Sequence, residues 1–465
     1  MNDKLNLPAP VLILFTVTVA FYCTAFNGDF HYDDSLTILE NPHVDRFDTF
    51  IGHLDHMVRP VLYATFLIDR SLFGLNPVGY HLLNLMLHLG SGLLLYRILT
   101  NAVPDKAASI PFWAALLFLN HPIATEAVTY ISGRASGLMA FFYLLAFFLY
   151  LRASEQRDAG TDRRLISVAV VSFLLSLGSK ETAMTFPFVL LLWDVFIRQL
   201  RGASLRTAIL SRHLPFWIVL ILTAGWAWGH PRYFALAQFS LDIRPFWENA
   251  LSELHAMTYG ASLLVCPWKQ NFDHDLPVFQ SITQWPLPLD LLAWGALIVA
   301  AIRWRRDPLI TFGLAWYVLQ WIPMILIPRV DLLSERNLYL PSIGLLLALV
   351  VLGAFIIEWL APIFQRHRLI RFVSAGLAAA LVAVLCLFTY QRNLLYQDRL
   401  LLWSDAVRKS PNKARPHNNL GYAYSLHGDW DRAIEEFRTA AQLDLDYVLA
   451  QENLRDAYLH RVGRQ

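Results

Sequence analysis

The stretch VLILFTVTVAFYCTAFNGDFHYDDSLTILENP, Val11 to Pro42, places a long apolar run shortly before two adjacent acids, Asp33 and Asp34. Its apolar part, Val11–Phe26, approaches the roughly 20 residues that a helix needs to cross a bilayer. No convincing small-residue cleavage site follows this run, and further apolar runs come later. We therefore expect a retained membrane helix rather than a signal peptide, with the acids just beyond its outer end.

The composition of the whole chain extends this pattern. The 465 residues are 56% hydrophobic and 16% charged, and the mean hydropathy is +0.41. A soluble protein would carry about a quarter charged residues, so the shortfall predicts an all-α, polytopic membrane helical bundle. The net charge of +2 gives no sign of nucleic-acid binding, and the three cysteines lie too far apart for a disulfide framework or a zinc site.

Eleven apolar stretches approach membrane length. They begin near Val11, Tyr80, Ala108, Ser136, Leu165, Thr182, Leu214, Leu287, Pro308, Tyr339 and Ile370. A twelfth stretch, Ala250–Cys266, contains Glu253 and His255. If it crossed, the basic cluster Arg303–Arg306 would lie outside, against the positive-inside rule. We therefore expect a re-entrant or interfacial helix there and about 11 transmembrane helices in all.

The positions of the basic residues predict the topology. With the N-terminus in the cytoplasm, the inner loops hold Arg97, Lys106, Arg152, Arg157, Arg163, Arg164, Arg198, Arg201, Arg206, Arg212, Arg303, Arg305, Arg306, Arg366, Arg368 and Arg371. The outer segments are then residues 27–79, 120–134, 230–285 and 328–338, the turn at residues 180–181, and the tail. We divide the chain into a membrane domain, 1–391, and an outer tail, 392–465.

The tail carries the signature of a short repeat. Asn419–Leu445 reads NLGYAYSLHGDWDRAIEEFRTAAQLDL, in which small and large apolar residues recur as in two interlocking antiparallel helices. A 34-residue shift maps Leu420 and Tyr424 onto Leu454 and Tyr458, as in tetratricopeptide repeats. About two repeats are few for a solenoid, so we expect the tail to dock on the membrane domain or on a partner. A structural cap and a peptide-holding module both remain open.

Charged residues gather at the outer helix ends. They are Asp33 and Asp34, Glu126 and Arg134 in HPIATEAVTYISGR, Lys180 and Glu181 in GSKETA, and Glu335 and Arg336 in LLSERNLYLPS. They could be solvated residues or interfacial ion pairs that fix helix packing. Charges near a bilayer are costly, however, so they tend to be paired or functional.

The first outer segment also contains His31, His43, His53 and His56, the last two as H-x-x-H. Such a pair on a helix could bind a metal. We expect surface histidines there instead, assign no metal site, and leave open a divalent cation beside the acids as the one candidate cofactor.

Several of these stretches carry a family resemblance. FHYDDSLTILENPHV, RPVLYATFLIDRSLFGLNPVGYHLLNLMLH, NHPIATEAVTYISGRAS, SKETAMTFPFVLLLWD and SERNLYLPSIG, in this order and followed by repeats, resemble the transmembrane and tetratricopeptide-repeat O-mannosyltransferases. That family belongs to the GT-C class of glycosyltransferases, which use lipid-linked sugars. The resemblance covers nearly the whole chain, although family members commonly carry a longer repeat array.

The resemblance implies a membrane enzyme that moves a sugar, typically mannose, from a polyprenyl-phosphate carrier to a Ser or Thr hydroxyl. One acid of the Asp33–Asp34 pair would be the catalytic base, and Arg336 a candidate for the carrier phosphate. We add Glu126, Arg134, Lys180, Glu181 and His31 as candidate substrate-binding residues. The implied partners are the lipid-linked sugar, the bilayer and a protein acceptor that the repeats could hold.

Two alternatives remain: a non-catalytic scaffold whose repeats recruit envelope proteins, and a GT-C enzyme that uses another sugar or a glycan acceptor. A transporter is disfavoured, because the charges lie at outer helix ends rather than at midpoints. The short tail favours a prokaryotic cell membrane, with the endoplasmic reticulum as the alternative.

Overall fold

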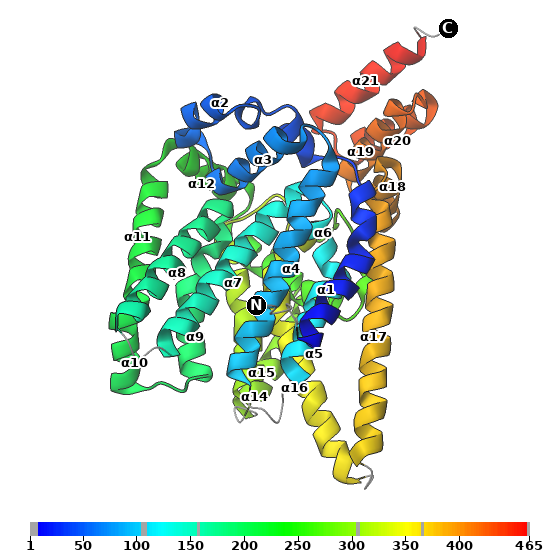
Figure 1. Cartoon of the computed structure of the whole chain (residues 1–465). Coiled ribbons are helices and arrows are strands. Elements are labelled where there is room, and N and C mark those ends of the chain that lie inside the picture. Colours follow the sequence, from blue (N-terminus) through cyan, green and yellow to red (C-terminus); the bar gives the residue numbers. More distant parts are fainter. Residues whose placement is uncertain (1–7, 104–108, 156–158, 304–306, 364–366, 463–465) are drawn as a thin grey trace, which may run out of the picture.

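The computed structural model describes residues 8–103, 109–155, 159–303, 307–363 and 367–462 (Figure 1). Throughout these ranges the regular structure is helical, without a strand. Five of the basic residues assigned to inner loops, Lys106, Arg157, Arg305, Arg306 and Arg366, lie outside the described residues.

Each of the eleven apolar stretches coincides with a helix. These helices are α1 (Ala9–Tyr22), α4 (Pro77–Ala102), α5 (Ser109–Asn120), α7 (Arg134–Glu155), α8 (Ala159–Ser179), α9 (Phe186–Phe196), α11 (Leu214–Gly229), α14 (Leu287–Arg303), α15 (Pro308–Leu326), α16 (Tyr339–Ile363) and α17 (His367–Leu395).

Within the described residues, seven helical segments are long and apolar enough to cross a membrane. They are Ala9–Asn27, Pro77–Ala102, Ile131–Glu155, Gly202–Gly229, Pro308–Leu326, Glu335–Leu360 and Phe372–Leu395. The predicted polytopic helical bundle is therefore confirmed, and the chain is a multi-pass membrane protein.

Further helices lie between these. They are α2 (Phe47–Gly52), α3 (Pro60–Phe73), α6 (Thr125–Val128), α10 (Gly202–Ala208), α12 (Pro231–Ile243) and α13 (Phe246–Leu263). Figure 1 shows α2, α3 and α12 at the same end as the C-terminal tail, whereas α10 lies at the opposite end. Segments predicted to lie outside thus share one end of the molecule, which we call the outer end.

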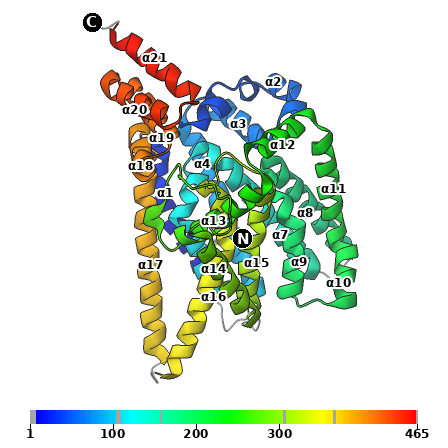
Figure 2. The same cartoon turned by 180° about the vertical axis from the view of Figure 1, so that it is seen from behind.

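Helix α13 covers most of the stretch predicted to be re-entrant or interfacial. It packs against α14 and α15 (Figure 2), and it is not among the seven membrane-length segments. Its Asn249 side chain is buried and donates to the main-chain oxygens of Met324 and Ile325 at the end of α15, 3.0 and 2.9 Å away. The Asn249 side chain therefore joins this helix to the end of α15.

The tail forms successive neighbouring helices, α18 (Arg399–Lys409), α19 (Ala414–Leu426), α20 (Trp430–Leu443) and α21 (Val448–Val462). A Cβ atom on Gly421 would lie 2.8 Å from the ring of Phe437, so only glycine permits this close contact between α19 and α20. The interlocking of small and large residues occurs at the positions expected from the sequence. The assignment to tetratricopeptide repeats stays a prediction.

Helices α15 and α16 touch through two glycines. A Cβ atom on Gly313 would lie 2.4 Å from the carbonyl oxygen of Gly344, and one on Gly344 would lie 2.3 Å from that of Gly313. The indole of Trp316 donates to the carbonyl oxygen of Leu340 over 2.8 Å. These contacts fix α16 along α15 and so place the connecting segment, residues 327–338, at the outer end.

We expect Gly344→Ala to lower the free energy of unfolding by about 1–3 kcal/mol, because the added methyl group overpacks this crossing. Gly353→Ala, on the same helix with nothing within 4 Å of the new atom, should instead stabilise by up to about 1 kcal/mol, since alanine favours helix. Thermal unfolding of the detergent-solubilised variants measures both. Equal shifts of the same sign would contradict the close crossing.

Candidate active site

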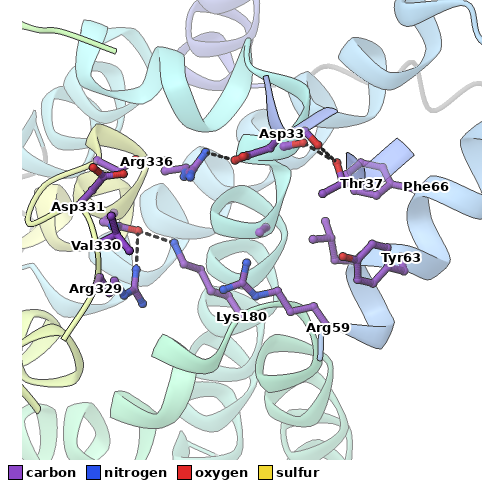
Figure 3. A pocket seen from close by; sticks show the side chains of 15 residues that line it. Asp33, Thr37, Arg59, Tyr63, Phe66, Lys180, Arg329, Val330, Asp331 and Arg336 are labelled. Carbon is purple, nitrogen blue, oxygen red and sulfur yellow. Dashed lines mark hydrogen bonds and ion pairs between the residues drawn. The ribbon is translucent and has the colours of Figure 1, made fainter. Parts of the chain in front are cut away.

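A cavity of about 260 Å³ lies at the outer end, where segments far apart in sequence converge (Figure 3). Its walls come from Asp33 and the turn after it, from α3 and the residue before it, from the start of α7, from the residue after α8, and from the α15–α16 connection. The lining residues are Asp33, Thr37, Arg59, Leu62, Tyr63, Phe66, Ser132, Ala135, Lys180, Arg329, Val330, Asp331, Ser334, Arg336 and Asn337. Four are basic and two are acidic, so the lining favours an anion.

The backbone of Tyr32 directs the two acids into different environments. Its φ of 42° lies in the left-handed region, which a bulky non-glycine residue rarely adopts and which costs about 1–3 kcal/mol. The next residue, Asp33, faces the cavity with 37% of its side chain exposed, whereas Asp34 is fully buried. The two neighbouring carboxylates therefore have different roles.

Asp34 holds the local backbone together. One carboxylate oxygen accepts the main-chain N–H of His31 at 2.7 Å, and the other accepts the N–H of Ser132 at 2.8 Å and also its hydroxyl. Burial raises the pKa of Asp34 to about 7, although these donated hydrogen bonds favour the charged form. Asp34 thus fastens the first outer segment to the start of α7.

Asp33 keeps its carboxylate available. Arg336 approaches it with Nη1 at 3.3 Å from Oδ2, and the Asp33 main-chain N–H donates to the Tyr130 hydroxyl oxygen over 2.9 Å. The Arg336 guanidinium lies over the Tyr130 ring, 5.5 Å from its centre. Asp33 is therefore held in place on one side and open toward the cavity on the other.

Three further cations stand across the cavity from Asp33 (Figure 3). Arg59 on α3 and Arg329 before α16 both bind Glu181, with nitrogen–oxygen distances of 3.0 and 3.1 Å. Lys180 Nζ and Arg329 both donate to the Asn337 side-chain oxygen, over 2.7 and 3.3 Å. Although burial opposes its charge, the adjacent Arg59, Arg329 and Lys180 hold the pKa of Glu181 well below its ordinary value.

Lys180 is buried next to these other positive charges. Burial lowers the pKa of its amine well below the usual value, and the positive charges of Arg329 and Arg59 lower it further. A bound anion would reverse this repulsion and favour the charged ammonium. The cavity is therefore electrostatically suited to a phosphate.

Three of the predicted substrate-binding residues lie behind the cavity wall. The buried Glu126 accepts the Ser334 hydroxyl at 2.7 Å and the Arg336 main-chain N–H at 3.0 Å, so it fixes the turn that carries Arg336. Arg134 is fully buried beside Asp69, 2.5 Å away. The His31 ring donates to the main-chain oxygen of Tyr396 over 2.7 Å.

Of the predicted residues, the structure therefore brings Asp33, Lys180 and Arg336 to the cavity, with Glu181 adjoining it. Sequence reasoning missed Arg59, Arg329 and Asp331. All three lie in segments already assigned to the outside, which was the available signal. Arg59 begins one of the stretches that carry the family resemblance, whereas Arg329 and Asp331 lie outside them.

The histidines of the first outer segment do not gather as an H-x-x-H site. The ring of His53 lies 4.0 Å from that of His43, and His56 lies 3.7 Å from Asp55. In the part of the chain that the structure describes, no three His, Cys, Asp or Glu side chains group as a metal site requires. A divalent cation remains an untested expectation.

We expect Asp34→Ala to lower the free energy of unfolding by about 1–3 kcal/mol near pH 5, because three donors lose their acceptor. Asp33→Ala should change it by less than about 0.5 kcal/mol, since that side chain is partly exposed. Comparable destabilisation of the two variants would contradict the division of roles between the acids.

The pH dependence follows from the same burial. In the unfolded chain an aspartate has a pKa of about 4. The folded protein therefore binds the proton of the Asp34 carboxyl more tightly than the unfolded chain does. The contribution of the protonated Asp34 to the free energy of unfolding is then fully present below about pH 4. It is lost progressively as the pH rises from about 4 to about 7. The difference in melting temperature between wild type and Asp34→Ala should shrink across this window. A constant difference would contradict the raised pKa.

Comparison with known proteins places this geometry in context. A protein O-mannosyl-transferase of Caenorhabditis elegans is 27% identical over 94% of this chain and 63% of its own length. Protein O-mannosyl-transferase TMTC3 of Homo sapiens is 26% identical over 98% of this chain and 53% of its own length. Protein O-mannosyl-transferase TMTC4 of Homo sapiens is 26% identical over 92% and 65%, respectively.

The chain thus spans about half to two thirds of the length of these curated relatives. No family model and no solved structure matches it. Its predicted resemblance to the transmembrane and tetratricopeptide-repeat O-mannosyltransferases is nevertheless confirmed, because the named relatives align with nearly the whole chain.

Proposed function

We propose that this protein is a membrane glycosyltransferase that moves mannose from a polyprenyl-phosphate carrier to a Ser or Thr hydroxyl of a protein. The carrying observation is that Asp33, a carboxylate open to the cavity, faces Arg59, Lys180 and Arg329 across one space at the outer end. The names of the relatives, protein O-mannosyl-transferases, support the sugar and the protein acceptor.

The cationic side of the cavity suits the donor phosphate. A guanidinium stays charged and can donate two parallel hydrogen bonds to phosphate oxygens, and a lysine adds a compact charge. Arg59, Lys180 and Arg329 therefore join Arg336, for which the sequence predicted this role. The lipid tail must remain in the bilayer, so the phosphate has to lie at the membrane boundary.

The carboxylate side suits the acceptor hydroxyl. The oxygen of the acceptor hydroxyl attacks C1 of the sugar, and the bond from C1 to the phosphate oxygen breaks. Asp33 accepts the proton of the hydroxyl. The polyprenyl phosphate leaves with the electron pair and gains one negative charge, which the cations stabilise. A phosphate is a good leaving group, so no strong general acid is needed.

The orientation in the membrane follows the charge distribution. The N-terminus would lie in the cytoplasm, and the cavity and tail would lie on the opposite side, in a prokaryotic cell membrane. The tail, which adjoins the site, is placed where an acceptor polypeptide would arrive.

The direct test reconstitutes the purified protein in nanodiscs with polyprenyl-phosphate mannose and a Ser/Thr peptide. Wild type should release free polyprenyl phosphate and mannosylate the peptide, and Asp33→Asn should reduce the rate by about 10²–10⁴-fold, because the amide cannot accept the proton. Unchanged transfer by Asp33→Asn would overturn the assignment of the base. No transfer by wild type, with normal folding, would favour another sugar or acceptor or a scaffold.

A second prediction concerns the donor. Arg329→Ala should raise the donor KM by about tenfold or more, because it removes charge-assisted hydrogen bonds to the phosphate. Arg70→Ala is the matched control, since Arg70 pairs with Asp45 at 2.7 Å and does not line the cavity. Equal effects of the two substitutions on KM would contradict a phosphate site at Arg329.

A further inference from the structure

The three residues that precede Asp33 are all held by the tail. Arg399 donates to the carbonyl oxygen of Phe30, with Nη2 at 2.9 Å, and the His31 ring donates to that of Tyr396. The Tyr32 ring packs edge-on against Trp403, with ring centres 5.7 Å apart. The left-handed residue that directs Asp33 into the cavity is thus in contact with a separate part of the chain.

Arg415 on α19 completes this contact and extends it to the cavity wall. Its guanidinium lies 5.8 Å from the centre of the Tyr32 ring and 2.5 Å from an oxygen of the buried Asp273. It also lies 2.7 Å from Asp331, which lines the cavity. Lys413 binds the same two acids, 2.6 and 3.0 Å away.

Resting on the function proposed above, we infer that the tail helps to form the active site by positioning one of its residues. Arg415 and Trp403 are positioning residues that hold Tyr32 in its left-handed conformation, so that Asp33 faces the acceptor. The physical reason is that φ near 42° is unfavourable for tyrosine and persists only where surrounding contacts over-determine it. Glycine adopts such a φ without assistance.

This difference provides the test. Tyr32→Phe keeps the ring and should transfer mannose as wild type does. Tyr32→Ala removes the ring but not the steric penalty, and should lower kcat by about tenfold with little change in the donor KM. Tyr32→Gly removes the ring and also the steric penalty, so its kcat should be about fivefold higher than that of Tyr32→Ala. If the glycine variant is as slow as alanine or slower, the inference is wrong, because Tyr32 then acts through packing alone.

Substitutions in the tail test the same link from the other side. Arg415→Ala should lower kcat about tenfold in the wild-type background and clearly less in the Tyr32→Gly background, because the two residues act on one conformation. The matched control is Arg432→Ala. Arg432 lies over the ring of Tyr424 within the tail, 5.1 Å from its centre, and it does not line the cavity. Equal effects of Arg415→Ala and Arg432→Ala would overturn the inference.

A readout independent of transfer separates this inference from the proposed function. Hydrogen exchange of the full-length protein should be faster in residues 30–37 of Arg415→Ala than of wild type or Arg432→Ala. If wild type fails to transfer mannose but this acceleration is seen, the proposed function is wrong and the tail contact stands. If exchange is unchanged, the tail does not hold the turn.

Discussion

The arrangement of the outer end depends on the need to satisfy buried carboxylates. No more than 1% of the surface is exposed in each of three acids, Asp34, Glu126 and Glu335. A buried carboxylate without partners is very unfavourable, so each one fixes the groups that donate to it. Glu335 receives the main-chain N–H of Asn271 at 2.6 Å and Arg392 at 2.8 Å, which ties α17 to the segment before α16.

These buried acids leave the remaining charges free to face a substrate. Glu126 accepts the Ser334 hydroxyl and the Arg336 main-chain N–H on either side of Glu335. Asp34 accepts the main-chain N–H of His31, just before Tyr32, and that of Ser132. Asp33, Arg59 and Arg336 are then positioned without being enclosed. The same residue type thus serves as a structural anchor where it is buried and, in the proposed function, as the proton acceptor where it faces the cavity.

Much of this organisation could be predicted from the sequence. Hydropathy identified every long helix of the bundle, because a membrane-spanning segment must satisfy its backbone internally and be apolar along its whole length. The positive-inside rule then grouped the outer segments, and hence the candidate charges, on one side. Hydropathy is a property of one segment, and the positive-inside rule counts charges over loops. Both can therefore be read without knowledge of tertiary contacts.

The individual roles could not be predicted in this way. Asp33 and Asp34 are identical neighbours, and their environments differ because Asp33 follows the left-handed Tyr32 and pairs with Arg336, whereas Asp34 is enclosed by donors from His31 and Ser132. Arg134 resembled Arg336 as a charge at a helix end, yet its partner Asp69 lies on α3 and buries it completely. Arg59 and Arg329 lie close together because both form ion pairs with Glu181, and only the structure shows these pairs. These properties arise from pairings between distant segments, which one sequence does not encode locally.

The contact between Phe30 and Arg399 joins residues 369 positions apart. During synthesis, the acid pair leaves the ribosome long before Tyr396 and Arg399, which hold the residues in front of it. A nascent chain would therefore complete its membrane insertion before the turn at Tyr32 could settle. The turn that orients Asp33 is thereby completed only after the residues near Arg399 have been made and have packed against it.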